Sequence, residues 1–205
     1  MRKAITFSLL IISIIFFNSC KKTIKKDGDG DIKTYSINAN NSSIKWTAYK
    51  TTSKIPVNGE FTSFEVDETK KGDSPLEVLN NLKFNIPIAS LYTADTLRDA
   101  KLKKFFFGSM QNTASISGEI FMNNDTSGTV GITMNGITHS LPISTVFTNQ
   151  SATIEATMDL DNWQAQAAIK ALNVVCSELH TGNDGISKTW NEVKINIVAS
   201  FKKEE

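Results

Sequence analysis

Strict alternation of apolar and polar residues constrains the fold of this chain more than any other feature. The alternation is clearest in five segments, at residues 44–48, 82–88, 130–134, 154–160 and 193–197. Because successive side chains of a β-strand point to opposite faces, such segments predict strands with one buried face and one solvated face. A sheet built from strands of this kind is typical of antiparallel all-β proteins.

The turns between these segments indicate how the strands connect. Asn135-Gly136 separates two alternating runs and predicts a tight hairpin, since both residues tolerate a positive φ. Pro142 in the second arm predicts an edge, a bulge or an end of pairing, and Gly59 predicts a kink or a close backbone approach. With eight or nine strands and few long helices, we expect the sheet to curl on itself into a barrel.

Two segments depart from the alternation and predict short helical insertions. In the first, Thr93 or Asp95 can cap a helix that continues to about Lys104. The second continues from about Trp163 to His180 and carries an apolar stripe.

Three consecutive phenylalanines, Phe105 to Phe107, follow the first insertion. So much aromatic surface predicts contact with a core, a partner or a ligand. In an extended chain Phe105 and Phe107 point to one side and Phe106 to the other. We therefore expect Phe105 and Phe107 to face the inside of the barrel at one end, with Phe106 packed on the opposite side.

Residues 1–19 have the features of a secretory leader, with Arg2 and Lys3 before an apolar run of 14 residues. That run is shorter than the roughly 18 to 20 residues that span a bilayer as a helix. The segment "FFNSC" resembles the lipobox of bacterial lipoproteins, in which the cysteine is lipidated and becomes the mature N-terminus, although Phe17 and Asn18 depart from the commonest pattern. We expect lipidation at Cys20. An uncleaved anchor and an ordinary cleaved leader are the alternatives.

The residues after the leader indicate a tethered domain. Residues 20–34 lack apolar periodicity and predict a flexible tether, so the folded domain is expected at 35–205. Cys20 and Cys176 are the only two cysteines, and lipidation of Cys20 leaves Cys176 without a disulfide partner. The 22 basic and 21 acidic residues nearly balance, which gives no electrostatic basis for binding nucleic acid.

Several motifs, in their order along the chain, resemble the YceI-like family of bacterial exported proteins. The segments are "SSIKWTAYK", "VNGEFTSF", "IPIASLYTADTLRDAKLKKFFF", "VGITMNGITHSLPI", "ATMDLDNW" and "VKINIVASF". The resemblance covers residues 35–202. It implies a lipocalin-like eight-stranded antiparallel barrel whose apolar lumen holds a long polyisoprenoid or a similar amphiphile.

The inward positions of the strands supply the candidate ligand-binding residues. A long apolar ligand needs a tunnel of apolar side chains and a polar group for its head. The candidates for the tunnel, with the two outer phenylalanines included, are Trp46, Phe61, Phe84, Ile86, Phe105, Phe107, Ile132, Met134, Ile154 and Met158. Arg98 and Lys101 are the candidates for a charged head group. No motif for a cofactor or a metal is present, and we expect neither.

Two alternatives to lipid carriage stay open at this point. Side chains can fill an eight-stranded barrel, and a filled barrel would act as a protein-interaction module of the cell envelope. Cys176 and His180, spaced i and i+4 on a helix, could form a nucleophile and base pair, but they lack an orienting third group, so we expect no enzymatic activity.

From these patterns we expect a lipid-anchored protein of the cell envelope that sequesters or transports its ligand. Lys21 replaces the aspartate that is associated with inner-membrane retention in some bacteria, which favours the outer membrane. The sequence does not fix the oligomeric state, and a homodimer is one alternative.

Overall fold

The computed structural model describes residues 34–204. The expected leader and Cys20 lie outside these residues, as does the expected tether except for its last residue. That residue, Thr34, begins strand β1 (Thr34–Ile37). Strand β1 thus includes the last residue of the expected tether.

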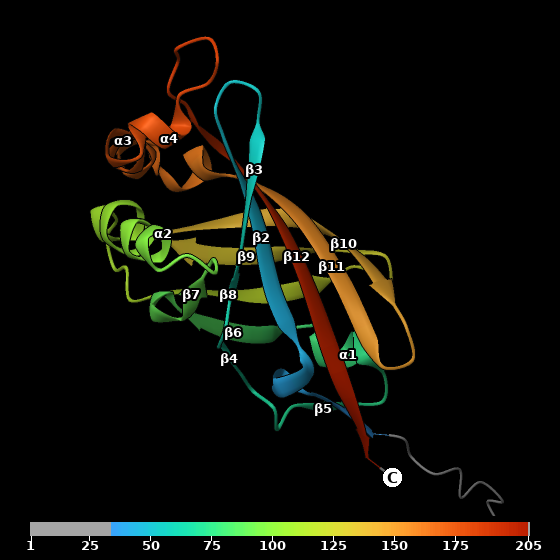
Figure 1. Ribbon diagram of the computed structural model, residues 1–205. Helices are drawn as coiled ribbons and strands as arrows, with labels where there is room; N and C mark the ends of the chain where they lie inside the picture. The colour runs from blue at the N-terminus through green and yellow to red at the C-terminus, as the bar shows by residue number, and fades with distance from the viewer. Residues whose placement is uncertain (1–33, 205) are drawn as a thin grey trace, which may run out of the picture. The chain divides into compact units, whose positions relative to one another are not determined.

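A single antiparallel sheet curls round to form most of the domain (Figure 1). Its eight long strands, in order across the sheet, are β6 (Leu82–Pro87), β8 (Ser115–Met122), β9 (Ser127–Met134), β10 (Ile137–Phe147), β11 (Ser151–Asp159), β12 (Thr189–Glu204), β2 (Ser43–Lys50) and β3 (Ile55–Phe61). The expected all-β class and the eight principal strands are confirmed. Four shorter strands bring the sheet to 12.

The shorter strands extend the sheet at its edges. β4 (Glu65–Val66), which follows β3 in the chain, pairs with β6. β7 (Leu91–Tyr92), which follows β6, pairs with β3. The two outer long strands are therefore each extended by a short strand from the other edge. Between these edges Ser90 accepts a hydrogen bond from the Thr62 amide at 2.9 Å, and its hydroxyl donates to the Ser63 carbonyl at 2.9 Å. β1 pairs with β12 and with β5 (Lys71–Gly72).

The expected hairpin joins β9 to β10. Asn135 and Gly136 have φ values of 53° and 71°, as a two-residue turn of this kind requires. Pro142 pairs with β9, whereas pairing between β10 and β11 begins only at Ser144. Pro142, which has no amide hydrogen, therefore lies just outside the hydrogen-bonded ladder between β10 and β11, at an end of pairing as predicted.

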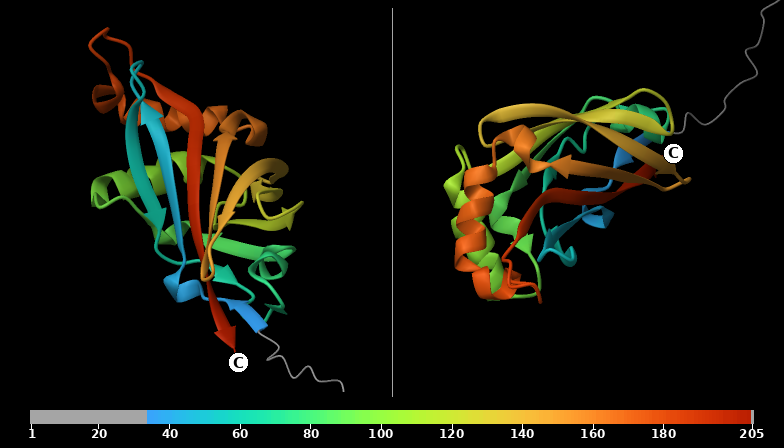
Figure 2. Two further views of the ribbon diagram at one scale, coloured as in Figure 1. Left: turned by 90° about the vertical axis from the view of Figure 1, so that its right-hand side faces the viewer. Right: turned by 90° about the horizontal axis from the view of Figure 1, so that it is seen from above.

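Helices cover the two ends of the barrel. The two predicted insertions are present, and α1 (Pro75–Leu79) is an additional helix that the alternation does not predict. The first insertion comprises α2 (Thr96–Lys101), the π-helix η3 (Leu102–Phe106) and the 3-10 turn η4 (Phe107–Ser109), and the second comprises η5 (Leu160–Trp163), α3 (Gln166–Val175) and α4 (Ser177–His180). Two further 3-10 turns are η1 (Ala39–Asn41) and η2 (Ile88–Ser90). α3 packs against η3 and η4, so both insertions lie at one end, which we call the helical end (Figures 1 and 2).

The phenylalanine run is helical, so the prediction of its side-chain directions was wrong. Neighbouring residues in a helix differ by roughly a quarter turn, and adjacent rings do not point to opposite faces as they do in a strand. Phe106 and Phe107 are both buried, with ring centroids 4.9 Å apart in an edge-to-face arrangement. Phe105 is half-buried, and the Lys104 ammonium lies 5.2 Å from its ring centroid.

Trp163 attaches the second insertion to the barrel. Its side chain is fully buried, and its indole N–H donates to the Ile132 carbonyl on β9 at 2.9 Å. The Asn135 side-chain amide of the hairpin donates to the Trp163 carbonyl at 2.8 Å. These bonds hold the helical end against the β9–β10 hairpin.

Candidate ligand-binding lumen

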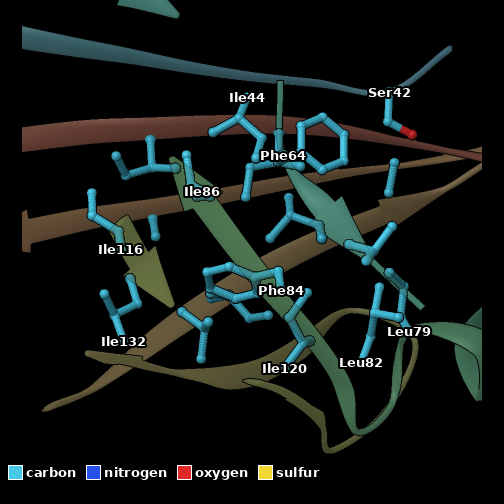
Figure 3. Close-up of a pocket in the computed structure, with 18 of the residues that line it drawn as sticks. Ser42, Ile44, Phe64, Leu79, Leu82, Phe84, Ile86, Ile116, Ile120 and Ile132 are labelled. Carbon is cyan, nitrogen blue, oxygen red and sulfur yellow. The ribbon is translucent and has the colours of Figure 1, made fainter. Parts of the chain in front are cut away.

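The first of two apolar cavities, which we call the deep cavity, lies within the curled sheet. Its volume is about 110 Å³, roughly ten times the space that one buried water needs. Figure 3 shows Ile44, Phe84 and Ile132, from three different strands, facing one common space. Ser42 is the polar residue of its lining, and its hydroxyl donates to the Asn38 carbonyl at 2.8 Å. The deep cavity therefore offers an almost purely hydrocarbon surface.

The second cavity, which we call the helix-end cavity, lies where the barrel meets the two insertions. It also measures about 110 Å³. Helical side chains contribute Leu102, Phe106 and Leu172 to its lining. Four residues line both cavities, which therefore adjoin: Phe61, Ile116, Met158 and Ile195. Together the two cavities form the lumen of the barrel.

Most of the residues proposed for ligand contact face this lumen. The deep cavity is lined by Phe61, Phe84, Ile86, Ile132, Ile154 and Met158. The helix-end cavity is lined by Trp46, Phe61, Phe107, Met134 and Met158. Phe105, which was expected to face the lumen, lines neither cavity. Phe106 lines the helix-end cavity in its place, because the segment is helical and not extended.

Three side chains on strands that line the deep cavity are partly exposed. Ala156, Ile195 and Ile197 lie on strand faces that line the deep cavity, yet each is only half-buried. In a barrel filled by its own side chains such positions are close-packed. The deep cavity shows that side chains do not fill this barrel completely.

Gly59 makes room for Trp46 in the lumen. The two residues are paired between β3 and β2, and a Cβ at residue 59 would lie 2.2 Å from Cζ2 of the indole. The close approach predicted at Gly59 is thus present. The indole N–H of Trp46 is buried and has no hydrogen-bond partner among residues 34–204.

Asn173, His180 and Thr189 form a hydrogen-bonded group at the helical end, which we call the polar cluster. Thr189 lines the helix-end cavity and pairs with Lys50 across β12 and β2. The Thr189 hydroxyl donates to Asn173 Oδ1 at 2.8 Å and lies 2.6 Å from His180 Nδ1. Burial, and to a smaller extent the charges of Lys50 and Lys101, lower the pKa of His180 to about 4. His180 is therefore neutral near pH 7.

The geometry around Cys176 does not resemble an activated nucleophile. The thiol is buried, and burial raises its pKa, whereas a reactive thiolate needs a lowered pKa. The His180 imidazole bonds to Thr189 and Asn173, and His180 contacts Cys176 through its backbone amide, which donates to the Cys176 carbonyl at 2.9 Å.

The two candidate head-group residues differ in their surroundings. Arg98 Nη2 lies 3.2 Å from Asp95 Oδ2, and Asp95 also caps α2, so this guanidinium is paired within its own helix. Lys101 is half-buried near His180 and Cys176. Sequence reasoning missed Lys50, although Ile44, Trp46, Ala48 and Lys50 follow one alternating face of β2. That alternation is the signal that could have identified it.

Residues 34–204 contain no group of three or more histidine, cysteine, aspartate or glutamate side chains placed to hold a metal ion. Within that same range, no helix has the length and apolar character to cross a bilayer.

Comparisons with known proteins agree with this architecture. A polyisoprenoid-binding domain from Saccharophagus degradans superposes with a TM-score of 0.61 at 10% identity, covering 83% of this chain and 98% of that domain. BcnA from Burkholderia cenocepacia superposes with a TM-score of 0.52 at 13% identity, covering 81% of this chain and 99% of that protein. Comparison with curated protein sequences gives no significant match. The family model described as the YceI-like domain matches residues 35–201, and the chain therefore belongs to the YceI-like family.

Proposed function

We propose that this protein binds a polyisoprenoid or another long-chain amphiphile in its lumen. The observation that carries the proposal is the pair of adjoining apolar cavities with polar residues at one end. Membership of the YceI-like family supports it, as does the fold shared with a domain described as polyisoprenoid-binding.

Burial of hydrocarbon provides the binding energy. Each buried methylene stabilises a complex by about 0.8 kcal/mol, so a five-carbon isoprene unit contributes about 4 kcal/mol before the cost of ordering the chain. Affinity should therefore rise with chain length until the lumen is full.

The protein binds its ligand without changing it chemically. The raised pKa of the Cys176 thiol and the involvement of His180 in hydrogen bonds to Thr189 and Asn173 support a binding role over catalysis. The proposed benefit is that an insoluble chain is sequestered from water or transported between sites.

The proposal places the barrel in the cell envelope. The leader and the lipobox-like segment support lipidation at Cys20, and two or three acyl chains would anchor the protein stably. Lys21 favours the outer membrane.

A role in protein interaction is the alternative function. Exposed apolar side chains on and next to the helices of the second insertion favour it, namely Val174, Leu179 and Ile186, together with Leu97 on α2. Such side chains serve equally well for contact with a membrane from which a lipid is taken up.

Native mass spectrometry of the full chain tests the proposed function. The protein is stripped of lipid in detergent and then incubated with farnesol, geranylgeraniol or a longer polyprenol. We expect one chain to bind per protein, with retention increasing with chain length. Absence of lipid both in the freshly purified protein and after incubation with every chain would refute lipid binding and leave protein interaction as the better account.

A further inference from the structure

We propose that the hydrocarbon chain of the ligand enters and leaves the lumen sideways, through the barrel wall between β10 and β11. This inference rests on the proposed lipid binding and adds the route by which the ligand reaches its site. The two strands pair near the tip of their hairpin and diverge toward the helical end, as the left view of Figure 2 shows. We call the unpaired interval between them the fork.

Strand pairing defines where the fork begins. β10 and β11 pair over four residues each, and the pair nearest the fork is Ser144 with Glu155. Beyond that pair, β10 extends to Ile137 and is paired with β9, whereas β11 extends to Asp159 and is paired with β12. The ladder that closes the barrel wall between β10 and β11 therefore stops at Ser144 and Glu155.

The β10 edge of the fork carries backbone groups that lie outside any ladder. The Thr145 amide donates to the Thr126 carbonyl, on the β9 side of the strand, at 2.9 Å. Because successive amides of a strand point to opposite sides, those of Ser140 and Thr138 point into the fork, and Pro142 has no amide hydrogen. These last three residues are exposed. Widening the fork thus breaks no hydrogen bond between strands, whereas opening a paired part of the wall would break several.

A groove on the outer face of the sheet crosses the beginning of the fork. Its volume is about 740 Å³, which lies within the range of small-molecule sites. Residues 142–144 of β10 and 155–157 of β11 line it, and the first and last residue of each triplet are exposed. Ile143, Ala156 and Ile195 line both this groove and the deep cavity. The groove and the deep cavity therefore lie on opposite sides of the same wall residues.

Two alanines on β11 show how the fork changes burial along one strand face. Ala152 pairs with Phe147 of β10 and is fully buried. Ala156 lies four residues further along the same face, is paired with β12 alone, and is half-buried. The departure of β10 thus uncovers an inward position of the wall.

Trp163 closes the other end of the fork. β11 continues into η5, whose last residue is Trp163. The Trp163 indole donates to the Ile132 carbonyl on β9 and packs edge-to-face against the His139 ring on β10, with ring centroids 5.2 Å apart. Between this contact and the ladder, Leu141 and Ile143 of β10 line the deep cavity. A chain that passes through the fork thus reaches the deep cavity directly.

Entry through either end of the barrel would displace buried side chains. Phe106 and Phe107 cover the helical end, and Val78 and Leu79 of α1 cover the other. Exposing such side chains to water is unfavourable. The β10 edge of the fork is already exposed, so the side route should have the lower barrier.

A reversible tether across the fork tests the proposal. Ser140→Cys and Thr157→Cys are introduced on its two edges in the full chain with Cys176→Ala, and a bismaleimide linker that contains a disulfide joins them after folding. Uptake of farnesol is followed by tryptophan fluorescence, since Trp46 lines the helix-end cavity, and release by exchange against deuterated farnesol in native mass spectrometry. Because a route affects the barrier and not the bound state, we expect the tether to slow uptake and release by the same factor. That factor should be at least about tenfold, with an unchanged dissociation constant.

The matched control places the same tether where the wall is already closed. Val146 and Thr153 are partners in the β10–β11 ladder, and Val146→Cys/Thr153→Cys receives the same linker in the same background. This protein should take up and release farnesol at the wild-type rates. Reduction of the linker should restore the wild-type rates to the fork-tethered protein, which shows that its fold is intact.

Three results would overturn the side route and leave lipid binding intact. They are wild-type rates in the fork-tethered protein, equal slowing by the fork and ladder tethers, and slower uptake with unchanged release. Failure of the untethered wild-type protein to bind farnesol or any longer polyprenol would instead refute the proposed function.

Discussion

Enlarging one side chain that faces the deep cavity should separate lipid binding from stability. Ala156 on β11 lines that cavity and is half-buried, whereas Ala152, four residues earlier on the same face, is fully buried and lines neither cavity of the lumen. Replacing alanine by leucine adds three carbon atoms at each position. The two substitutions are chemically identical, so their different effects report the space around each residue.

The expected magnitudes follow from that space. At Ala156 the three added carbons enter the cavity and contribute up to about 2.4 kcal/mol of apolar burial, at about 0.8 kcal/mol each. At Ala152 they meet close-packed neighbours, and overpacking costs about 1–3 kcal/mol. Ala156→Leu should therefore leave the free energy of unfolding unchanged or raise it, while Ala152→Leu should lower it.

Urea denaturation followed by circular dichroism measures the stability of both variants, and native mass spectrometry measures their polyprenol uptake. We expect Ala156→Leu to bind markedly less polyprenol than wild-type protein in spite of its intact stability. If Ala156→Leu is destabilised as much as Ala152→Leu and takes up polyprenol normally, the deep cavity is not the binding space.

Three further predictions concern individual contacts. Gly59→Ala should lower the free energy of unfolding by about 1–3 kcal/mol because its Cβ overlaps the Trp46 ring, and Trp46→Leu in the same chain should recover part of that loss. The pKa of His180 is about 4 in the folded protein and 6.5 when unperturbed, so the unfolded state binds the proton first as the pH falls. Between pH 6.5 and pH 4, wild-type protein should therefore lose about 1–2 kcal/mol of stability relative to His180→Gln, after allowance for solvent screening. Urea midpoints of the two proteins that stay parallel across this window would contradict the assignment. Phe106→Ala should cost about 3–5 kcal/mol and Phe105→Ala much less, as measured by thermal unfolding, whereas equal losses would contradict the helical placement of the run.

Much of the barrel could be predicted from the sequence because its signals are local. Alternation assigns the long strands, and Asn135-Gly136 fixes the register of one hairpin through its own backbone preferences. α1 was missed although Ser74 caps it and Pro75 occupies its first turn, because only five residues follow the cap and no apolar periodicity develops.

The candidate site depends on distant contacts that a linear pattern does not contain. Phe105, Phe106 and Phe107 are adjacent in sequence, and only packing of η3 against α3 selects which rings enter the lumen. The hollow interior depends on how Ala156 and Ile197 meet side chains from other strands. Asn173, His180 and Thr189 come from α3, α4 and β12, and their hydrogen-bonded group follows from the folded chain alone.

Photo-crosslinking of a bound isoprenoid tests lumen binding most directly. The full chain is loaded with farnesol that carries a diazirine at its terminal isoprene unit, irradiated, digested and mapped by mass spectrometry. We predict adducts on side chains of the deep cavity, such as Ile120, Val130 and Ile143, and fewer adducts in Ala156→Leu. Adducts confined to outward-facing exposed residues such as Val146 and Leu179, unchanged in Ala156→Leu, would contradict binding in the lumen.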